Sequence, residues 1–596
     1  MNSEDSRNLI LAIVLSAIVL IGWSYVFPQK TRPTPPVAPV AAGTANPAAN
    51  AANGATAPGN AGPGQAPALP RSDALAASPR VTIDAPGVGG SINLDGGEID
   101  DVFLKAYRET IDPKSPNVVL FSPATAPEPY WAETGFVTSD KAVKTPNRTT
   151  RWTSAGGDLT PSHPVTLTWD NGEGLVFTRE IAVDDKYMFT VTDKVENKGT
   201  SPVSLRPYGL IRRIGTPKVS GYSVLHEGFL GVIGDSSVQE VTYTGIEKET
   251  DKVKELKGGG GWLGFTDKYW ASALIAPPSE QIDARFSASG AQPREDYQSD
   301  FVAAALDVAP GATASNATHI FAGAKEVGTI DGYGAALGIR KFDLMIDWGW
   351  FYFITKPLYH LIDFIYKYVG NFGVAILCVT VIVKGVLFPL ANTSYRSMAR
   401  MKLLQPKLAA LKEQFPNDPQ KQQQAQMELM RKEGVNPVAG CLPMLVQIPV
   451  FFALYKVIFI TIEMRHAPFF GWIKDLSAPD PTNIFNLFGL LPIDPTTVPI
   501  FGHFLALGVW PLIMGFTMFL QMKMQPEPAD PTQKMMFTYM PFIFTFMFGS
   551  FPAGLVIYYA WNNSLTVLQQ SLIMKRAGNK VELFDNLRKM FFKPAA

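Results

Sequence analysis

From about residue 340 onward, the chain alternates long apolar runs with short basic loops. Apolar runs of about 20 residues match the roughly 30 Å hydrocarbon core of a bilayer, so they predict membrane-spanning helices. The sequence before about residue 340 instead predicts a soluble domain. The 596-residue chain is therefore predicted to be a polytopic membrane protein with one large soluble insert.

The soluble part shows the alternation and turn signals of an antiparallel β sandwich. The stretch TWDNGEGLVFTREIAV, residues 168–183, predicts two strands joined at an Asn-Gly turn. In YMFTVTDKVENKG, which starts at Tyr187, the apolar residues share one face at a period of two. The glycine run at 258–261 is predicted to be a loop, and it lacks the Lys-Ser/Thr and helix of a phosphate-binding loop.

These patterns divide the chain into consecutive segments. In order, they are a first span (1–28), an Ala/Pro/Gly linker (29–79), the external β domain (80–338), an interfacial amphipathic helix (339–368), a second span (369–391), a cytoplasmic helical hairpin (392–435), a third span (436–463), an external loop (464–500), the fourth to sixth spans (501–574) and a basic cytoplasmic tail (575–596).

Two of these segments allow an alternative. Ala-rich sequence follows the first apolar run, so a cleaved signal peptide competes with a span at residues 9–27. The linker cannot bury a core and is predicted to be a flexible tether. In 339–368 the polar residues fall on one helical face, which is typical of a helix in the membrane interface, although an ordinary packing helix shows the same period. These polar residues are Lys356, His360, Asp363 and Lys367.

Basic residues set the predicted orientation, because cytoplasmic loops are enriched in Lys and Arg. The segment 392–435 and the tail 575–596 are rich in both, whereas 464–500 has only Arg465 and Lys474. Six spans then place both termini in the cytoplasm and the β domain outside. The basic residues of 392–435 are either a solvated face with a topology signal or a docking surface.

Composition excludes several classes of function. The formal net charge is +0, so no global basic field attracts nucleic acid. The chain has two cysteines, Cys378 and Cys441, both in apolar runs, and six scattered histidines, so neither disulfides nor a metal site is predicted. The sequence contains no Walker A, H-E-x-x-H or G-x-S-x-G motif, and no catalytic residue is predicted.

One lysine interrupts the apolar run AILCVTVIVKGVLFPL, residues 375–390. No other charge lies between Lys367 and Arg396, and on a straight helix the nearer one is about 18 Å from Lys384. A mid-bilayer lysine costs about 3 kcal/mol on insertion scales, and the spans offer almost no carboxylate to pair with it. Lys456 is a second lysine in an apolar run, but it is close enough to the outer end of its span to reach the interface.

Neutral polar groups and water are therefore predicted to solvate Lys384. Candidates are Thr380, one turn earlier, Gln447 in the next span, and the polar residues of the last span, which are Tyr558, Tyr559, Asn562 and Asn563. Taken singly, each is better explained by a hydrogen bond between helices. Taken together around an unpaired cation, they predict a hydrated site that attracts an anionic guest from the cytoplasm.

The membrane part resembles the YidC/Oxa/Alb family of membrane protein insertases, specifically the Gram-negative bacterial YidC type. The resemblance covers about 340–575 and rests on RSMARMKLLQPKL, VNPVAGCLPMLVQIPVFFALY, DLSAPDP, DPTQKMMFTYMP and FPAGLVIYYAWNNSLTVLQQ. The external domain matches more weakly, through GWLGFTDKYW at 261–270.

The resemblance implies a periplasmic β-supersandwich and a five-helix core in the bacterial inner membrane. It also implies a hydrophilic groove that is open to the cytoplasm and to lipid. Lys384 occupies the position of the groove's basic residue, which is usually arginine in the family, and groove roles map onto Thr380, Gln447 and Tyr559, with Asn563 nearby. The hairpin with Arg396, Arg400, Lys402 and Lys407 resembles the family's recruiting element for incoming chains.

The predicted function is membrane insertion and chaperoning of nascent membrane proteins, without a cofactor and without direct use of nucleotide. The implied partners are nascent membrane proteins, the ribosome, the Sec translocon and membrane lipids. Two alternatives stay open. One is a secondary transporter or channel that uses Lys384, and the other is an envelope-binding β domain on a membrane anchor.

Overall fold

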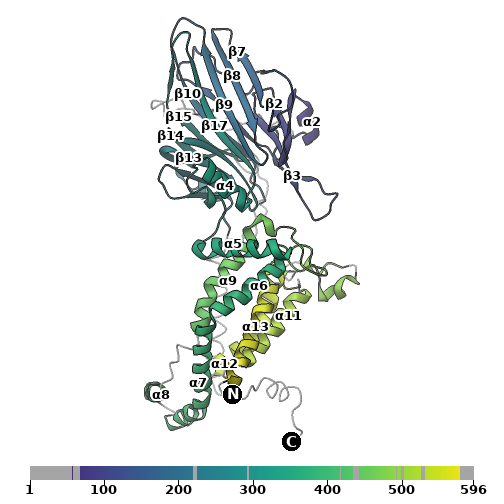
Figure 1. The fold of residues 1–596 in the computed structure, drawn as a ribbon, viewed down its shortest axis with the longest axis vertical. Coiled ribbons are helices and arrows are strands. Elements are labelled where there is room, and N and C mark those ends of the chain that lie inside the picture. Colours follow the sequence, from purple (N-terminus) through teal and green to yellow (C-terminus); the bar gives the residue numbers. More distant parts are fainter. Residues whose placement is uncertain are drawn as a thin grey trace, which may run out of the picture. The chain divides into compact units, whose positions relative to one another are not determined.

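The structure is a computed structural model that describes residue 57 and residues 68–218, 225–290, 294–415, 418–433, 442–491, 493–497, 502–505, 507–524 and 531–576. The predicted first span, most of the linker, the segment 434–441 and the tail from 577 lie outside these residues. Contacts divide the chain into two compact units, with a boundary in the sequence between Asp347 and Trp348 (Figure 1). The described residues before this boundary are here called the β unit, and those after it are called the helical unit.

Within the described residues, the β unit holds 17 strands. They are β1 Arg80–Asp84, β2 Val88–Asn93, β3 Ile99–Arg108, β4 Asn117–Phe121, β5 Tyr130–Val137, β6 Thr153–Ser154, β7 Val165–Asp170, β8 Leu175–Val183, β9 Met188–Asn197, β10 Val203–Ile214, β11 Gly228–Ile233, β12 Gln239–Thr242, β13 Val253–Thr266, β14 Trp270–Ser289, β15 Asp296–Ala303, β16 Leu306–Val308 and β17 Thr313–Ala324. Short helices accompany them: α2 Arg71–Ala76, α3 Tyr243–Ile246, η1 Thr250–Lys252, α4 Val327–Ala336 and η2 Phe342–Met345.

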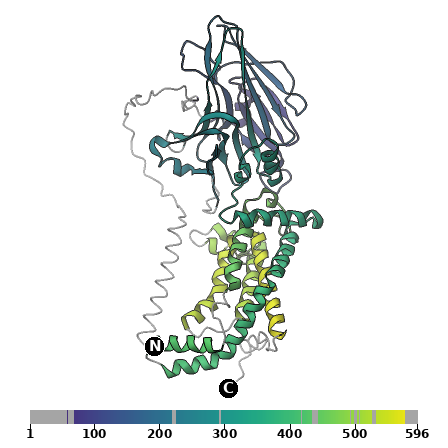
Figure 2. The same ribbon diagram turned by 60° about the vertical axis from the view of Figure 1, so that its left-hand side comes forward.

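The hairpin of β13 and β14 joins two sets of antiparallel strands, which are visible as the upper part of Figure 2. The first half of β14 pairs with β17, which continues through β9, β8 and β7. Its second half pairs with β15, which continues through β10 and β5. A long hairpin shared by two sets of strands within one connected sheet agrees with the predicted all-β domain, and the implied supersandwich stays an expectation.

The predicted strand pair around the Asn-Gly turn is confirmed, since β7 pairs with β8 from Val165 opposite Ile181 to Asp170 opposite Val176. Every second side chain of β8 is buried. One of these is Arg179, whose Nε donates to Asp193 Oδ1 at 2.7 Å. The pair lies on the buried face of the strand, where an unpaired charge would be costly.

The prediction that the glycine run at 258–261 is a loop is wrong, because these residues lie inside β13 and pair with β14. The pairing register shifts between Gly259 and Gly261, which marks a β-bulge. Gly260 has φ +58°, and a Cβ there would lie 2.3 Å from Pro277 O. A Cβ on Gly261 would lie 2.1 Å from Val232 O. Glycines are required where neighbouring backbones leave no room for a side chain.

Glu326 fixes helix α4 to the β unit. Its carboxylate accepts hydrogen bonds from the hydroxyls of Tyr107 at 2.9 Å, Tyr187 at 2.7 Å and Thr329 at 2.7 Å, and from Lys186 Nζ at 3.1 Å. Burial alone would raise the pKa of Glu326, but these hydrogen bonds outweigh it and lower the pKa below its usual value near 4.5.

The helical unit contains α5 Tyr352–Val369, α6 Phe372–Val386, α7 Phe388–Gln414, α8 Pro419–Lys432, α9 Leu442–Ile460, α10 Gly502–Leu505, α11 Val509–Met524, α12 Pro531–Met547 and α13 Ala553–Arg576. Short 3₁₀ helices lie at η4 Ile462–Met464, η5 Ile484–Gly489, η6 Pro495–Thr497 and η7 Phe548–Ser550. Helix α13 packs against α6, α7, α9 and α11, so it forms the centre of this unit (Figure 1).

The helix over the predicted second span ends at Val386, and a new helix starts at Phe388. Pro389 explains the break, because it has no N–H and its ring crowds the preceding turn. Among the described residues, no single helix meets the length and hydropathy expected of a membrane span. Phe372–Val386 and Phe388–Met398 meet it together, with a bend of 65° between them. The number and extent of the spans stay predictions.

A loop at residues 465–482, here called the cap loop, closes one end of the helical unit. The side chain of Asp480 is buried, and its Oδ2 accepts a hydrogen bond from the backbone N of Trp510, in the first turn of α11, at 2.9 Å. Its Oδ1 accepts hydrogen bonds from Thr482 and from Trp472 Nε1. Gly508 leaves room for this carboxylate, because a Cβ there would lie 2.7 Å from Asp480 Cγ.

The same loop also contacts the N-terminal ends of two other helices. Ala553 N donates to Ala478 O at 2.7 Å at the start of α13, which satisfies one of the N–H groups that a helix leaves unpaired at its N-terminus. At the start of α6, the N-cap Asn371 donates from its side-chain Nδ2 to Phe469 O at 3.2 Å, while its own Oδ1 accepts from Val374 N. One loop therefore holds the ends of three helices together.

We expect Glu326→Gln to destabilise α4 by about 1–3 kcal/mol near pH 7, because it weakens hydrogen bonds to a charged acceptor. The folded pKa is depressed, so this contribution is present above the unfolded pKa near 4.5 and is lost as the pH falls through the folded pKa. Amide hydrogen exchange of Val327–Ala336 in the full chain, corrected for intrinsic rates, measures the stability of α4. It is compared near pH 7 and at a pH below the folded pKa of Glu326. The exposed Glu173, changed to Gln, is the control, and a pH-independent effect of Glu326→Gln would contradict the prediction.

We expect Asp480→Asn to destabilise the start of α11 by about 0.5–2 kcal/mol, because a charged N-terminal acceptor is replaced by a neutral one. Asp475→Asn is the matched control, since Asp475 accepts hydrogen bonds from Ser477 within the same loop. Hydrogen exchange in the first turn of α11 and the thermal unfolding midpoint in detergent report the change. Equal effects of both variants would show that Asp480 does not hold the helix.

Candidate functional site

Lys384 lies in the last turn of α6, and its side chain is half-buried. Its Nζ donates a hydrogen bond of 2.8 Å to Thr566 Oγ1 on α13. Thr566 is 4% exposed, and its hydroxyl donates in turn to Asn562 O at 2.7 Å. Within the described part of the chain, no carboxylate lies within ion-pair distance of this ammonium. A neutral hydroxyl therefore holds the charge.

This contact lies deep in the helical unit. At roughly 1.5 Å per residue, Lys384 is about 18 Å along α6 from Phe372, and Thr566 is about 20 Å along α13 from Ala553. Both starting points are at the end closed by the cap loop.

Helix α13 places a row of polar side chains at a spacing of four residues. Asn562, Thr566 and Gln570 share this spacing and are all buried. Gln570 Nε2 donates to Met524 O on α11 at 3.1 Å. The side-chain oxygens of Asn562 and Gln570 are buried and have no hydrogen-bond partner among the described residues. Buried polar oxygens of this kind are usually satisfied by water.

The other predicted site residues lie on the same group of helices but make separate contacts. Gln447 Nε2 donates to Tyr558 OH at 2.8 Å and joins α9 to α13. Asn563 Nδ2 reaches Thr517 Oγ1 on α11 at 3.4 Å. Among the described residues, neither of these groups hydrogen-bonds to Lys384.

Two further predictions concern Thr380 and Tyr559. The hydroxyl of Thr380 is buried and donates to Ile376 O at 2.7 Å, within its own helix. The ring of Tyr559 packs against Phe451 and Phe548, each with ring centroids 4.9 Å apart. The structure thus places Tyr559 among aromatic rings of neighbouring elements and Thr380 in a hydrogen bond within α6, while Thr566 is the residue that contacts the lysine.

Sequence reasoning missed Thr566. A threonine in an apolar helix carries little signal alone, because its hydroxyl can bond to the preceding turn. The available signal is the four-residue spacing that Thr566 shares with Asn562 and Gln570, which places all three on one face of α13.

The predicted recruiting hairpin corresponds to α7 and α8. Arg396 and Arg400 on α7 are exposed, and the side chain of Lys402 lies outside the described part. Lys407 Nζ contacts Glu433 Oε1, just after α8, at 2.6 Å, and so ties the two helices together. A role for these residues in docking stays a prediction.

Comparisons with known proteins cover both units. Residues 80–361 match the family described as the YidC periplasmic domain, and residues 364–580 match the family described as 60Kd inner membrane protein. The membrane protein insertase YidC of Beijerinckia indica subsp. indica is 59% identical over 601 residues, which cover 99% of this chain and 99% of that protein. Its counterpart from Bradyrhizobium diazoefficiens is 55% identical, with 99% of each chain covered.

A crystal structure of an active YidC insertase with the first transmembrane domain resolved aligns with a TM-score of 0.33 and 17% identity, over 82% of this chain and 91% of that one. The two family matches cover most of the sequence, and the two named relatives are more than half identical along nearly their whole length. The chain therefore belongs to the YidC family of membrane protein insertases.

Proposed function

We propose that the chain inserts nascent inner-membrane proteins, and helps them to fold, through a hydrated and positively charged site centred on Lys384. The observation that carries this proposal is the hydrogen bond from Lys384 to the neutral Thr566, with no acidic partner among the described residues. An ammonium without a countercharge inside an apolar helix keeps its attraction for a polar or acidic guest.

Water is the second component of the site. The buried oxygens of Asn562 and Gln570, together with Gln521 Oε1 on α11, have no hydrogen-bond partner among the described residues. Hydration of these groups would lower the desolvation cost of bringing a polar segment among the helices, which is several kcal/mol for each unpaired polar group. Thr380, Gln447, Tyr559 and Asn563 would shape the surrounding groove.

The asymmetry of the helical unit gives insertion a direction. The cap loop closes one end, which we assign to the periplasmic side, so the guest would enter from the opposite, cytoplasmic side. Its short polar flank contacts Lys384 while its apolar segment moves into lipid. Burial of that segment, at about 25 cal/mol per Å², drives the step without nucleotide.

The rest of the assignment follows the predicted topology. Both termini lie in the cytoplasm, the chain spans the inner membrane six times, and the β unit is periplasmic. The exposed Arg396 and Arg400 on α7 would receive chains from the ribosome, and the insertase works alone or beside the Sec translocon. Flanks that are short and weakly charged should cross readily, and long, highly charged flanks should not.

We expect Lys384→Arg to retain insertion of a short single-span substrate, and Lys384→Leu and Lys384→Glu to reduce its rate by about tenfold or more. A tenfold loss corresponds to about 1.4 kcal/mol, which is a modest effect for removing the charge that attracts the polar flank of the guest. Insertion into proteoliposomes, scored by protease protection of the substrate flank, measures the rate.

Lys456→Leu is the matched control for this series. Lys456 is also in an apolar helix, but it lies one turn from the end of α9 and its stem packs beside Gly349. Its removal should leave insertion nearly unchanged. Equal activity of the Arg, Leu and Glu variants at position 384 would remove the electrostatic part of the proposal.

We expect Thr566→Val to slow insertion by about threefold to tenfold, because it removes the acceptor of Lys384 without changing side-chain shape. Thr566→Ser keeps the hydroxyl and should retain activity. Thr461→Val is the control, since that buried hydroxyl, directly after α9, donates to Val457 O in the last turn of the helix. The same proteoliposome assay applies, and equal rates for the Val and Ser variants at position 566 would show that this contact has no role.

A further inference from the structure

An apolar loop follows the cap loop in the helical unit. It comprises residues 483–493, and the structure describes all of them except Pro492. Most of its large apolar side chains are exposed, namely Phe485, Leu487, Phe488, Leu490, Leu491 and Ile493. A contiguous exposed apolar surface of this kind marks a contact with a membrane or with another protein.

The polar side chains of the apolar loop bond to backbone groups instead of facing outward. Asn483 is buried, its Oδ1 accepts a hydrogen bond from Phe485 N at 2.9 Å, and its Nδ2 donates to Leu505 O at 2.7 Å. Asn486 Nδ2 donates to Ile493 O at 3.5 Å. The loop thus keeps its amides inside and its apolar side chains outside, which is the reverse of the arrangement that water favours.

The backbone of the apolar loop also bonds to itself. Phe488 N donates to Asn483 O at 2.8 Å, and Leu491 N donates to Asn486 O at 3.0 Å. In this turn Leu487 and Phe488 have φ values of 53° and 60°, in the left-handed region that large side chains seldom adopt. Internal bonding of this kind is what hydrocarbon requires of a backbone, because no water there can replace it.

The base of the apolar loop is fixed to the start of α11. Ile484 N donates to Leu507 O, and Val509 N donates to Thr482 Oγ1, each at 3.0 Å. Exposed apolar side chains continue along the first turns of α11, at Leu512, Ile513 and Phe516. This part of the chain lies within the match to the 60Kd inner membrane protein family, so we expect these side chains of α11 to face acyl chains. The apolar loop therefore begins beside a surface that lipid is expected to cover.

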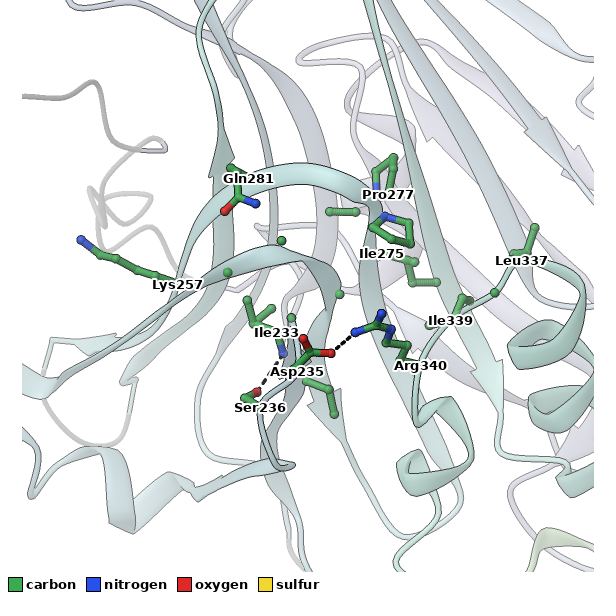
Figure 3. A pocket seen from close by; sticks show the side chains of 18 of the residues that line it. Ile233, Asp235, Ser236, Lys257, Ile275, Pro277, Gln281, Leu337, Ile339 and Arg340 are labelled. Atoms are coloured by element: carbon green, nitrogen blue, oxygen red, sulfur yellow. Dashed lines mark hydrogen bonds and ion pairs between the residues drawn. The ribbon is translucent and has the colours of Figure 1, made fainter.

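The composition of the apolar loop distinguishes lipid from a protein partner. No Asp, Glu, Lys or Arg occurs between Asp480 and Asp494 in the sequence. A protein interface normally has a polar rim around its apolar centre. The cavity of about 610 Å³ in the β unit shows the contrast, because Lys257 and the ion pair of Asp235 with Arg340 are among its lining residues (Figure 3). An uncharged surface favours acyl chains as the occupant.

We propose that the apolar loop inserts into the bilayer leaflet on the capped side of the helical unit, where its exposed side chains lie among acyl chains. Trp472 lies at the boundary with the head groups, since its ring is exposed and its Nε1 donates to Asp480 Oδ1 at 3.1 Å. The loop thereby fixes the depth of the capped end in the membrane. Part of the segment 464–500, which the sequence predicts to be an external loop, is then inside the bilayer.

Nitroxide accessibility tests this with the full chain in nanodiscs that hold one copy each. Both cysteines are replaced by serine, and a spin label is attached through Leu490→Cys or Leu491→Cys. Leu69→Cys in the β unit is the matched control, because Leu69 is 40% exposed and Leu491 is 41% exposed. The ratio of collision rates with oxygen and with a water-soluble nickel chelate should be at least about tenfold higher at 490 and 491 than at 69, because hydrocarbon excludes the polar chelate.

Two results would overturn the proposal. One is an equal ratio at all three positions, which would place the apolar loop in water. The other is a low collision rate with both reagents at 490 and 491, which would show that protein covers the loop instead of lipid.

A second variant asks whether the apolar side chains hold the loop in the bilayer. Phe488→Asp, added to the chain labelled at 491, keeps a residue type that tolerates a positive φ and places a carboxylate among the acyl chains. The collision ratio at 491 should fall by about threefold or more, because a charge is costly in hydrocarbon. Ile111→Asp is the matched control, since Ile111 is 57% exposed and Phe488 is 58% exposed.

An unchanged ratio in the Phe488→Asp chain, or an equal fall in the Ile111→Asp chain, would contradict an anchor formed by this loop. The measurement involves no substrate, so a failure here leaves the insertase proposal unaffected. A failure of the Lys384 series, conversely, leaves the position of the apolar loop testable.

Discussion

The hydrogen bond between Lys384 and Thr566 is the interaction on which the functional account depends. It holds an ammonium against a neutral hydroxyl, about 18 Å along α6 from the capped end of that helix. A carboxylate partner would neutralise the charge and favour a dry, closed helix interface. A hydroxyl orients the charge and leaves its attraction for an anionic or polar guest in place, which suits a site that binds many unrelated segments briefly.

The cap loop makes the two ends of the helical unit around this charge different from each other. The loop satisfies N–H groups at the starts of α11 and α13 and accepts a hydrogen bond from the N-cap side chain of α6, so it closes one end of the helical unit. Closure at one end and a polar row along α13 support the proposal of a site that is approached from the other end. In the β unit, the glycine run allows neighbouring backbones to approach closely where β13 passes β11 and β14.

Much of this architecture follows from sequence pattern. The Asn-Gly turn predicted the β7–β8 pair, and the unpaired Lys384 was evident from the composition of its run. Three features did not follow. The glycine run 258–261 lies inside a strand because of backbone crowding from distant residues, which no local pattern encodes. The break at Leu387 depends on Pro389 in an apolar run. Thr566 became significant only once the fold placed α13 beside α6.

The most direct test asks whether the surroundings of Lys384 are wet and positive. In a chain whose cysteines are replaced by serine, Thr566→Cys reports both properties through its reaction with small anionic and cationic thiosulfonates in proteoliposomes. The account predicts modification by both reagents, faster with the anionic one, and loss of that preference when Lys384→Leu is added. A thiol that resists both reagents, or an equal preference with and without the lysine, would contradict a hydrated cationic site.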